Sequence, residues 1–103
     1  NDWMRPALYK AYHRIIPSKK NRNRVLKTHD FVGPICETTD KFSTIKSYQR
    51  IYEGDNLVIC DVGAYGKVLS SNYNLRINSR EILIKKSKIF EIKKRQKILD
   101  IIL

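Results

Sequence analysis

The sequence predicts a mainly β protein, built as an antiparallel β-domain with short helices. Short apolar runs separated by turn residues recur along the chain, and the continuous run Leu57–Cys60 is typical of a strand. Residues 81–86 and 89–93 have the pattern of the two arms of a hairpin. Because 103 residues suffice for one domain with a modest core, we expect residues 1–103 to form a single β-domain.

The first third of the chain predicts a short helix, a loop and a strand. Residues 1–16 carry a short apolar periodicity, and Pro6 suits the first turn of a helix, where its missing N–H leaves nothing unpaired. Residues 17–23 are polar and rich in turn formers, which predicts a loop. The segment Val25–Cys36 predicts a strand that breaks at Gly33.

The middle of the chain offers weaker patterns. Residues 37–52 are expected to be weakly ordered, because they show no clear alternation. The apolar run Leu57–Cys60 predicts a strand buried on both faces. Gly63 and Gly66 predict a tight turn around Tyr65, since glycine tolerates the backbone angles that such turns require.

The end of the chain predicts a hairpin followed by a helix. The hairpin turns around Ser87. Over the last ten residues, 94–103, the residues Ile98, Ile101 and Ile102 recur at helical spacing. We therefore expect a C-terminal helix there.

The formal net charge of +11 is the strongest feature of the composition. Alone it favours a nucleic acid or another anionic partner. The excess is mostly lysine, accompanied by isoleucine and asparagine, as A/T-rich coding sequences tend to give, and the basic residues are scattered. We therefore expect no nucleic acid partner, and a small basic RNA-binding domain stays as an alternative.

Nothing in the sequence predicts membrane insertion, a signal peptide or a metal site. No apolar run reaches the roughly 18 residues that a spanning helix needs, so cytosol is the expected location. Cys36 and Cys60 lie far apart in sequence and favour free thiols. Cys60 is expected to fill the core, and His13 and His29 have no metal-ligand partner at a useful spacing.

Four segments, in order, resemble the C-terminal half of the diaminopimelate decarboxylase family. They are Met4-Arg5-Pro6-Ala7-Leu8-Tyr9 with Ala11-Tyr12-His13, then Val32-Gly33-Pro34-Ile35-Cys36-Glu37, then Asp61-Val62-Gly63-Ala64-Tyr65-Gly66, and Ser70-Ser71-Asn72-Tyr73-Asn74. Each segment alone is short, but the four together cover about residues 1–84. Thr38-Thr39 and Val62 depart mildly from the family pattern, at positions without a functional role.

The resemblance implies a fold, a cofactor and a partner. Family members are fold-type III, alanine-racemase-like enzymes, with a (β/α)8 barrel that holds pyridoxal 5'-phosphate and a C-terminal β-domain. Their active site lies between the barrel of one subunit and the β-domain of its partner in a homodimer. The chain resembles the β-domain alone, and none of its thirteen lysines resembles the lysine that binds the cofactor. We expect the isolated chain to be inactive.

The resemblance also assigns roles to five residues. Cys36 is the expected catalytic acid, which protonates the substrate carbon after CO2 leaves. Glu37 is expected to accept the distal ammonium of meso-diaminopimelate, whereas ornithine and arginine decarboxylases have aspartate after the cysteine. Arg5 and Tyr9 are expected to bind the distal carboxylate, and Tyr65 to reach both substrate and cofactor. Without the motifs, simpler structural interpretations would apply. They are a small structural thiol for Cys36, an exposed salt bridge for Arg5, a solvated carboxylate for Glu37 and a packed turn tyrosine for Tyr65.

The function that the resemblance implies is decarboxylation of meso-diaminopimelate to L-lysine and CO2, with the chain as one part of the enzyme. A second hypothesis is a relic of a split gene without function. The intact Arg5, Tyr9, Cys36, Glu37 and Tyr65 argue against long decay, because random drift would have changed some of them.

Overall fold

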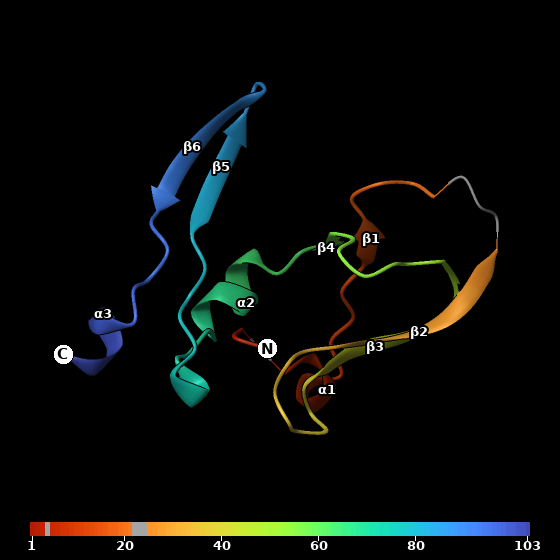
Figure 1. Ribbon diagram of the computed structural model, residues 1–103, viewed down its shortest axis with the longest axis horizontal. Coiled ribbons are helices and arrows are strands. Elements are labelled where there is room, and N and C mark those ends of the chain that lie inside the picture. The colour runs from red at the N-terminus through yellow and green to blue at the C-terminus, as the bar shows by residue number, and fades with distance from the viewer. Residues whose placement is uncertain (4, 22–24) are drawn as a thin grey trace. The chain divides into compact units, whose positions relative to one another are not determined.

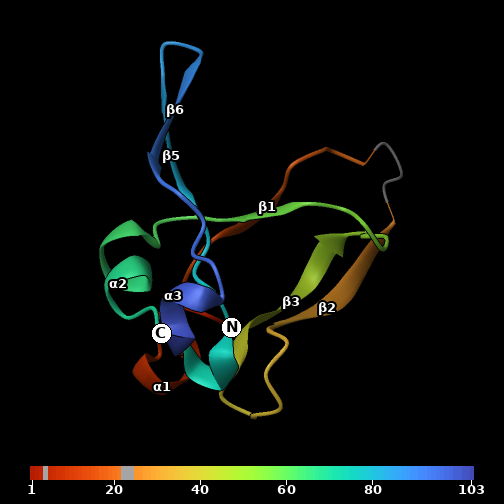
Figure 2. The ribbon, with the colours of Figure 1, turned by 60° about the vertical axis from the view of Figure 1, so that its left-hand side comes forward.

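The computed structural model describes residues 1–3, 5–21 and 25–103. Their contacts gather into two compact units, unit 1 (Asn1 and Trp3–Val68) and unit 2 (Asp2 and Leu69–Leu103). Across these ranges the strands form three separate two-stranded antiparallel sheets, accompanied by short helices (Figures 1 and 2). The mainly β fold class is confirmed, and the sheets do not close into a barrel. That residues 1–103 form one domain stays a prediction.

Unit 1 contains two short helices and four strands. In chain order they are α1 (Pro6–Tyr9), β1 (Ile15–Pro17), β2 (Leu26–Val32), β3 (Lys41–Gln49), β4 (Leu57–Ile59) and α2 (Gly63–Val68). Helix α1 begins at Pro6, as the sequence predicts, and ends at Lys10 in a left-handed conformation. Met4 of the first motif, and Arg22 and Asn23 of the predicted loop, lie outside the described residues.

The core of unit 1 forms where β1 meets the ribbon of β2 and β3. Ile15, Phe31 and Tyr48 are buried against one another, and Ile59 of β4 packs on the same cluster. The rings of Phe31 and Tyr48 meet edge to face, with centroids 5.1 Å apart. The hydroxyl of Tyr48 donates a hydrogen bond to the carbonyl of Ile15 at 3.1 Å, so the buried phenol is satisfied.

Strand β3 corrects the expectation that residues 37–52 are weakly ordered. Two register shifts in the β2–β3 pair explain why alternation fails in the sequence. Between the pairs Lys27↔Tyr48 and His29↔Ile45, β2 advances two residues while β3 advances three. Such a bulge keeps Ile45 and Tyr48 against the same core at a spacing that is not typical of a strand. The longest strand in the described part of the chain therefore lacks the period of two that typically marks a strand.

The short pair of β1 and β4 differs from the sequence expectation in two ways. The sequence patterns of residues 1–16 and 17–23 predict a short helix and a loop and no strand, yet Ile15–Pro17 pairs with Leu57–Ile59. The expected strand at 57–60 is present, but it is not buried on both faces, since Leu57 is 37% and Val58 46% exposed. The pair has an inner face that contributes Ile15 and Ile59, and an outer face open to solvent.

Helix α2 replaces the tight turn that Gly63 and Gly66 predict. Both glycines lie inside the helix, and neither has a positive φ. Gly66 is needed for space instead, because a Cβ added there would lie 2.9 Å from the Cβ of Val62. A close approach within one helical turn therefore explains this glycine better than turn geometry does.

Unit 2 consists of a 3-10 turn, a hairpin and a terminal helix. They are η1 (Tyr73–Leu75), β5 (Glu81–Lys85), β6 (Lys88–Lys93) and α3 (Leu99–Ile102). The hairpin is confirmed, and its two turn residues, Lys86 and Ser87, have φ of 47° and 62°. The predicted helix over 94–103 is present only as the four residues of α3. No helix in the described part of the chain is long and apolar enough to span a membrane.

Polar side chains hold the base of unit 2 together. The side-chain amide of Asn72 donates to the carbonyl of Arg76 at 2.9 Å and to Oε1 of Gln96 at 2.6 Å. That same Oε1 accepts the backbone N–H of Asn78 at 3.0 Å. Arg76 forms an ion pair with Asp2. Hydrogen bonds therefore connect the segment before the hairpin to the segment after it.

Candidate functional site

The candidate site is built on the loop between β2 and β3, residues 33–40. The loop closes on itself through backbone bonds: the N–H of Gly33 donates to the carbonyl of Asp40 at 2.9 Å, and that of Asp40 donates to the carbonyl of Glu37 at 3.1 Å. The N–H of Glu37 donates to the carbonyl of Ile35 at 2.8 Å. Ile35 is buried and anchors the loop, whereas Cys36 beside it is exposed. The loop thus presents a thiol to solvent from a fixed base.

Asp40 is the buried polar centre of this loop. Its residue is 2% exposed, and its carboxylate accepts the N–H of Ile35 and the side-chain amide of Asn1, both at 2.8 Å. It also forms an ion pair with the α-ammonium group of Asn1. Burial alone would raise the pKa of Asp40, but hydrogen bonds from the Asn1 ammonium, the Ile35 N–H and the Asn1 side chain lower that pKa below its usual value. Asp40 is therefore held as a carboxylate.

Gly33 is required by the position of Asp40. A Cβ added at Gly33 would overlap both carboxylate oxygens of Asp40. Any other residue at this position would push the carboxylate away from the loop that it stabilises. The glycine of the Gly33-Pro34-Ile35-Cys36-Glu37 motif is thus explained by a close approach, not by a positive φ.

Arg5 brings the N-terminal segment to the same loop. Its Nη1 donates to the carbonyl of Asn1 at 2.8 Å, and its Nη2 lies 3.6 Å from Oε2 of Glu37. Nη1 is also 4.0 Å from Oδ1 of Asp40. Arg5 precedes helix α1, which lies beside the start of β3 (Figures 1 and 2). The structure therefore brings together three of the predicted residues, Arg5, Glu37 and the neighbouring Cys36.

Tyr9 and Tyr65 lie on the two short helices and point to solvent. Tyr9, the last residue of α1, is 63% exposed, and Tyr65 in α2 is 73% exposed. Both phenols are thus accessible to a ligand.

The second cysteine has a different environment. Cys60 follows β4 and is half-buried, outside the core cluster in which it was expected. Its carbonyl lies 3.0 Å from Nδ1 of His13, and its N–H donates to the carbonyl of Arg14 at 2.8 Å. Contact with the Cys60 side chain raises the pKa of Arg14. His13 thus ties two segments together, as expected of a structural residue.

His29 is the other histidine that was expected to be structural. It lies in β2 with its ring next to those of Phe31 and Tyr48, at centroid distances of 6.2 and 6.0 Å. In the described part of the chain, no group of three or more His, Cys, Asp or Glu residues is arranged to hold a metal ion.

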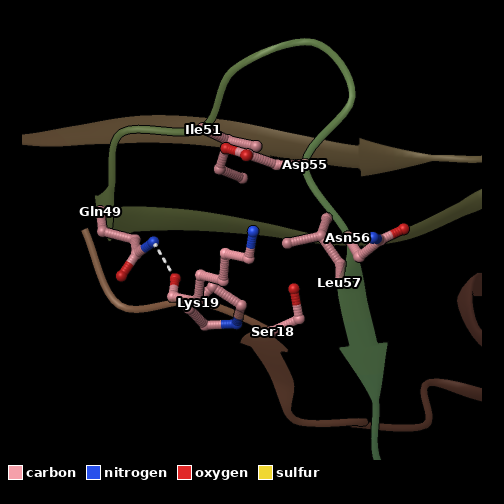
Figure 3. Close-up of a pocket in the computed structure, with 8 residues that line it drawn as sticks. Ser18, Lys19, Gln49, Ile51, Asp55, Asn56 and Leu57 are labelled. Atoms are coloured by element: carbon pink, nitrogen blue, oxygen red, sulfur yellow. Dashed lines mark hydrogen bonds between the residues drawn. The ribbon is translucent and has the colours of Figure 1, made fainter.

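A small pocket in unit 1 lies away from the predicted residues (Figure 3). It is bordered by the turn after β1, the end of β3 and the segment before β4. Its lining residues are Pro17, Ser18, Lys19, Gln49, Ile51, Asp55, Asn56 and Leu57. At one side of it, the side-chain amide of Gln49 donates to the carbonyl of Lys19 at 3.1 Å. None of the five predicted residues lines this pocket.

Sequence reasoning missed Asp40. The residue stands in a polar run after the Cys36-Glu37 pair, where nothing in the sequence distinguishes it from a solvated carboxylate. The one usable sign is Gly33, because a glycine at the end of a strand can mark a close approach of another group.

Known proteins are similar to this chain in sequence. The sequence model of the family described as "Pyridoxal-dependent decarboxylase, C-terminal sheet domain" matches residues 1–63. Diaminopimelate decarboxylase of Methanocaldococcus jannaschii is 42% identical over 103 residues, which cover 99% of this chain and 23% of the relative. The enzyme of the same name from Aquifex aeolicus is 40% identical over 97 residues, 93% of this chain and 23% of the relative.

Solved structures show the same relation. The crystal structure of diaminopimelate decarboxylase from M. jannaschii matches with a TM-score of 0.88 at 39% identity, covering 98% of this chain and 23% of that one. The Helicobacter pylori enzyme complexed with L-lysine matches with a TM-score of 0.81 at 34% identity, covering 96% and 24%. The chain thus spans about a quarter of the length of the curated relatives that it matches.

Proposed function

Because the chain belongs to the pyridoxal-dependent decarboxylase family, through its C-terminal sheet domain, we propose that it supplies one part of a diaminopimelate decarboxylase active site. The reaction is removal of CO2 from meso-diaminopimelate to give L-lysine. In this proposal the chain binds the unreactive end of the substrate and delivers a proton. The remaining parts of the site come from outside these 103 residues.

The observation that carries the proposal is the Arg5–Glu37 pair beside an exposed Cys36. The two charged groups are 3.6 Å apart and the pair is only partly buried. The distal carbon of diaminopimelate bears an ammonium and a carboxylate on the same atom. A neighbouring cation and anion complement that arrangement, because Arg5 can grip the carboxylate with its planar fork and Glu37 can accept the ammonium.

Cys36 is the group that we propose to act on the reacting carbon. Once CO2 has left, the substrate carbon needs a proton from a positioned acid. The thiol is exposed, and it is one residue from Glu37 on a loop anchored by buried Ile35. The same loop therefore binds one end of the substrate and presents a proton donor toward the other.

The exposed tyrosines fit a cofactor that lies mostly outside the chain. Tyr65 offers a phenol that projects to solvent and can donate to a phosphate or to the substrate, and Tyr9 offers a second donor near Arg5 in sequence. When bound, pyridoxal 5'-phosphate supplies an electron sink for the electron pair that stays on the substrate carbon when CO2 leaves. In this proposal Tyr65 contacts the cofactor without being its main anchor.

Cys36, Tyr9 and Tyr65 are exposed, and chemistry at such groups is inefficient while they are in contact with solvent. We propose that the (β/α)8 barrel of a second enzyme subunit covers them and excludes water, in a homodimer with shared sites. The exposure of the three side chains supports this arrangement. We also propose that the enzyme works in the cytosol.

The test is a chimera in which this chain replaces the matching part of the M. jannaschii enzyme, to which it is 42% identical. The chimera should release CO2 from meso-diaminopimelate. Cys36→Ala should lower kcat by about 10²–10⁴-fold with little change in KM, since a proton donor acts in the transition state. Cys60→Ala is the matched control and should keep kcat. Equal activity of the Cys36→Ala and unsubstituted chimeras would refute the assigned role.

Mixed dimers test the shared site. Subunits carrying Cys36→Ala are combined with subunits that lack the barrel lysine, so each kind is inactive alone. Random pairing gives half heterodimers, in which one of the two sites has both groups intact, so about a quarter of the sites should be restored. Mixtures that stay inactive would show that each subunit uses its own β-domain.

A further inference from the structure

Among the described residues, Asp40 is the charged side chain that the protein buries. A buried carboxylate is costly unless it is paired and hydrogen-bonded. Asp40 meets this condition through the α-ammonium of Asn1 and through hydrogen bonds from the Asn1 side chain and the Ile35 N–H. What the buried charge does follows from how its two oxygens are used.

The two oxygens of Asp40 face different parts of the candidate site. Oδ2 accepts the N–H of Ile35, the residue before Cys36, at 2.8 Å. Oδ1 faces the N-terminal segment, where it accepts the side-chain amide of Asn1 at 2.8 Å and lies 4.0 Å from Nη1 of Arg5. One carboxylate therefore bridges the segment that carries Arg5 and the loop that carries Cys36 and Glu37.

Asp40 also affects the orientation of Arg5 and the availability of Glu37 to a ligand. Arg5 lies near two carboxylates, Glu37 at 3.6 Å and Asp40 at 4.0 Å. The Asp40 carboxylate pairs more closely with the α-ammonium of Asn1 than with the guanidinium. It orients Arg5 mainly through Asn1, whose side-chain amide donates to Asp40 and whose carbonyl accepts Nη1 of Arg5. Glu37, whose side chain is 36% exposed, is then available to an incoming ammonium.

We propose that Asp40 is a positioning residue that holds Arg5 in register with the Cys36–Glu37 loop and thereby sets recognition of the substrate's distal carboxylate. This inference rests on the proposed function. Gly33 supports the same arrangement, because the Asp40 carboxylate can lie against the loop only if residue 33 has no Cβ. Asp40 touches neither substrate nor cofactor and acts through Arg5 and Ile35.

The test uses the chimeric decarboxylase with Asp40→Asn, which keeps the shape of the side chain but removes its charge. The readout is competitive inhibition by L-lysine and by 1,5-diaminopentane. These two probes differ by the carboxylate that Arg5 would bind. A misplaced Arg5 weakens L-lysine binding about tenfold and leaves the diamine almost unchanged, and KM for meso-diaminopimelate rises by a similar factor. If Asp40→Asn only destabilises the fold, fewer molecules are active and the apparent kcat falls. The ratio of the inhibition constants for L-lysine and 1,5-diaminopentane then stays unchanged.

The matched control is Asp30→Asn, because Asp30 pairs with Lys41 and Thr44 at the surface of the same strand pair. It should leave the inhibition ratio unchanged. Asp40→Glu keeps the charge and should lose less L-lysine affinity than Asp40→Asn. If Asp40→Asn fails to fold, Asn1→Ala removes one hydrogen bond to Oδ1 and should shift the ratio in the same direction by less.

The outcomes separate the two proposals. An unsubstituted chimera that releases no CO2 contradicts the proposed function itself. An active chimera in which Asp40→Asn, or Asn1→Ala in its place, gives the same inhibition ratio as Asp30→Asn overturns the positioning role alone.

Discussion

Units 1 and 2 contain similar strand pairs, but only unit 1 has a core. In the described part of the chain the buried hydrophobic residues, Ile15, Phe31, Ile35 and Tyr48, all belong to unit 1. The β5–β6 hairpin of unit 2 is equally apolar, yet its large side chains are exposed. They are Ile82, Leu83, Ile84, Ile89, Phe90 and Ile92, at 46–70%. A third element makes the difference, because β1 and β4 cover the β2–β3 ribbon, whereas a two-stranded hairpin alone is marginal.

The contrast assigns different tasks to the two units. Unit 1 uses its buried contacts to fix the loop that carries the candidate site residues Cys36 and Glu37, so its structure is largely self-supported. Unit 2 presents apolar side chains on both faces of its hairpin, because Leu83 and Phe90 oppose each other on one face and Ile84 and Ile89 on the other. Exposed apolar surface of this kind marks a region that gains stability from further contacts.

The sharpest test of the contrast replaces one phenylalanine in each unit. Phe31 is 7% exposed and Phe90 is 48% exposed, and both lie in strands. Phe31→Ala should lower the free energy of unfolding of unit 1 by about 3–5 kcal/mol, as large-to-small changes in cores do. Phe90→Ala should cost less than about 1 kcal/mol. Urea unfolding with residue-resolved amide exchange measures the change in unfolding free energy for both variants. Equal losses would contradict the statement that only unit 1 has a core.

Acid should weaken unit 1 selectively. Asp40 has a lowered pKa in the folded chain, so its stabilising contribution is present above the unfolded value of about 3.9 and is lost as pH falls through the folded pKa. The exposed Asp30 changes in the same direction, because hydrogen bonds from Lys41 and Thr44 lower its pKa. We expect the stability of unit 1 below about pH 3.9 to depend less on pH in Asp40→Asn than in Asp30→Asn. Identical pH profiles for the two variants would contradict the role of the buried carboxylate.

The parts of the fold that the sequence predicts are those with a local cause. Helix α1 starts at Pro6 because proline suits a first helical turn, and the hairpin follows from two apolar runs around a short turn. The sequence does not predict strand β3, because two bulges in its pairing with β2 remove the alternation of apolar and polar residues. The strand at 57–59 was found, but its exposure was not, since burial depends on neighbours that a local pattern does not reveal.

The candidate site was predictable through motifs and only in part. The motifs pointed to Arg5 and Glu37, which the structure places 3.6 Å apart, and to Cys36, which the structure shows to be exposed. The roles of these residues, and those of Tyr9 and Tyr65, stay predictions. Asp40 was not predictable, because its importance comes from contacts with Asn1 and Ile35 that appear only once the chain is folded.

The hairpin turn offers a way to stabilise the weaker unit. Lys86 and Ser87 both have positive φ, a geometry that favours asparagine and glycine in two-residue hairpins. The double change Lys86→Asn and Ser87→Gly should stabilise the hairpin by about 1 kcal/mol, since each non-glycine residue in this region carries strain. Slower amide exchange across β5 and β6 would show the gain, with β2 and β3 as the internal reference. Slower exchange in both strand pairs would mean that the two units are coupled.

The smallest expected effect concerns α2, the last element of unit 1, where two glycines in one helix have opposite constraints. Gly63 has open space around its Cα, so Gly63→Ala should stabilise the helix by about 0.5–1 kcal/mol through a less flexible unfolded chain. Gly66 is buried against Val62, and an added methyl 2.9 Å from the Cβ of Val62 should cancel that gain or reverse it. Amide exchange in residues 63–68 compares the two variants directly. Equal stabilisation by both would mean that α2 shifts freely, and its exposed Tyr65 would then lack the fixed support that ligand binding requires.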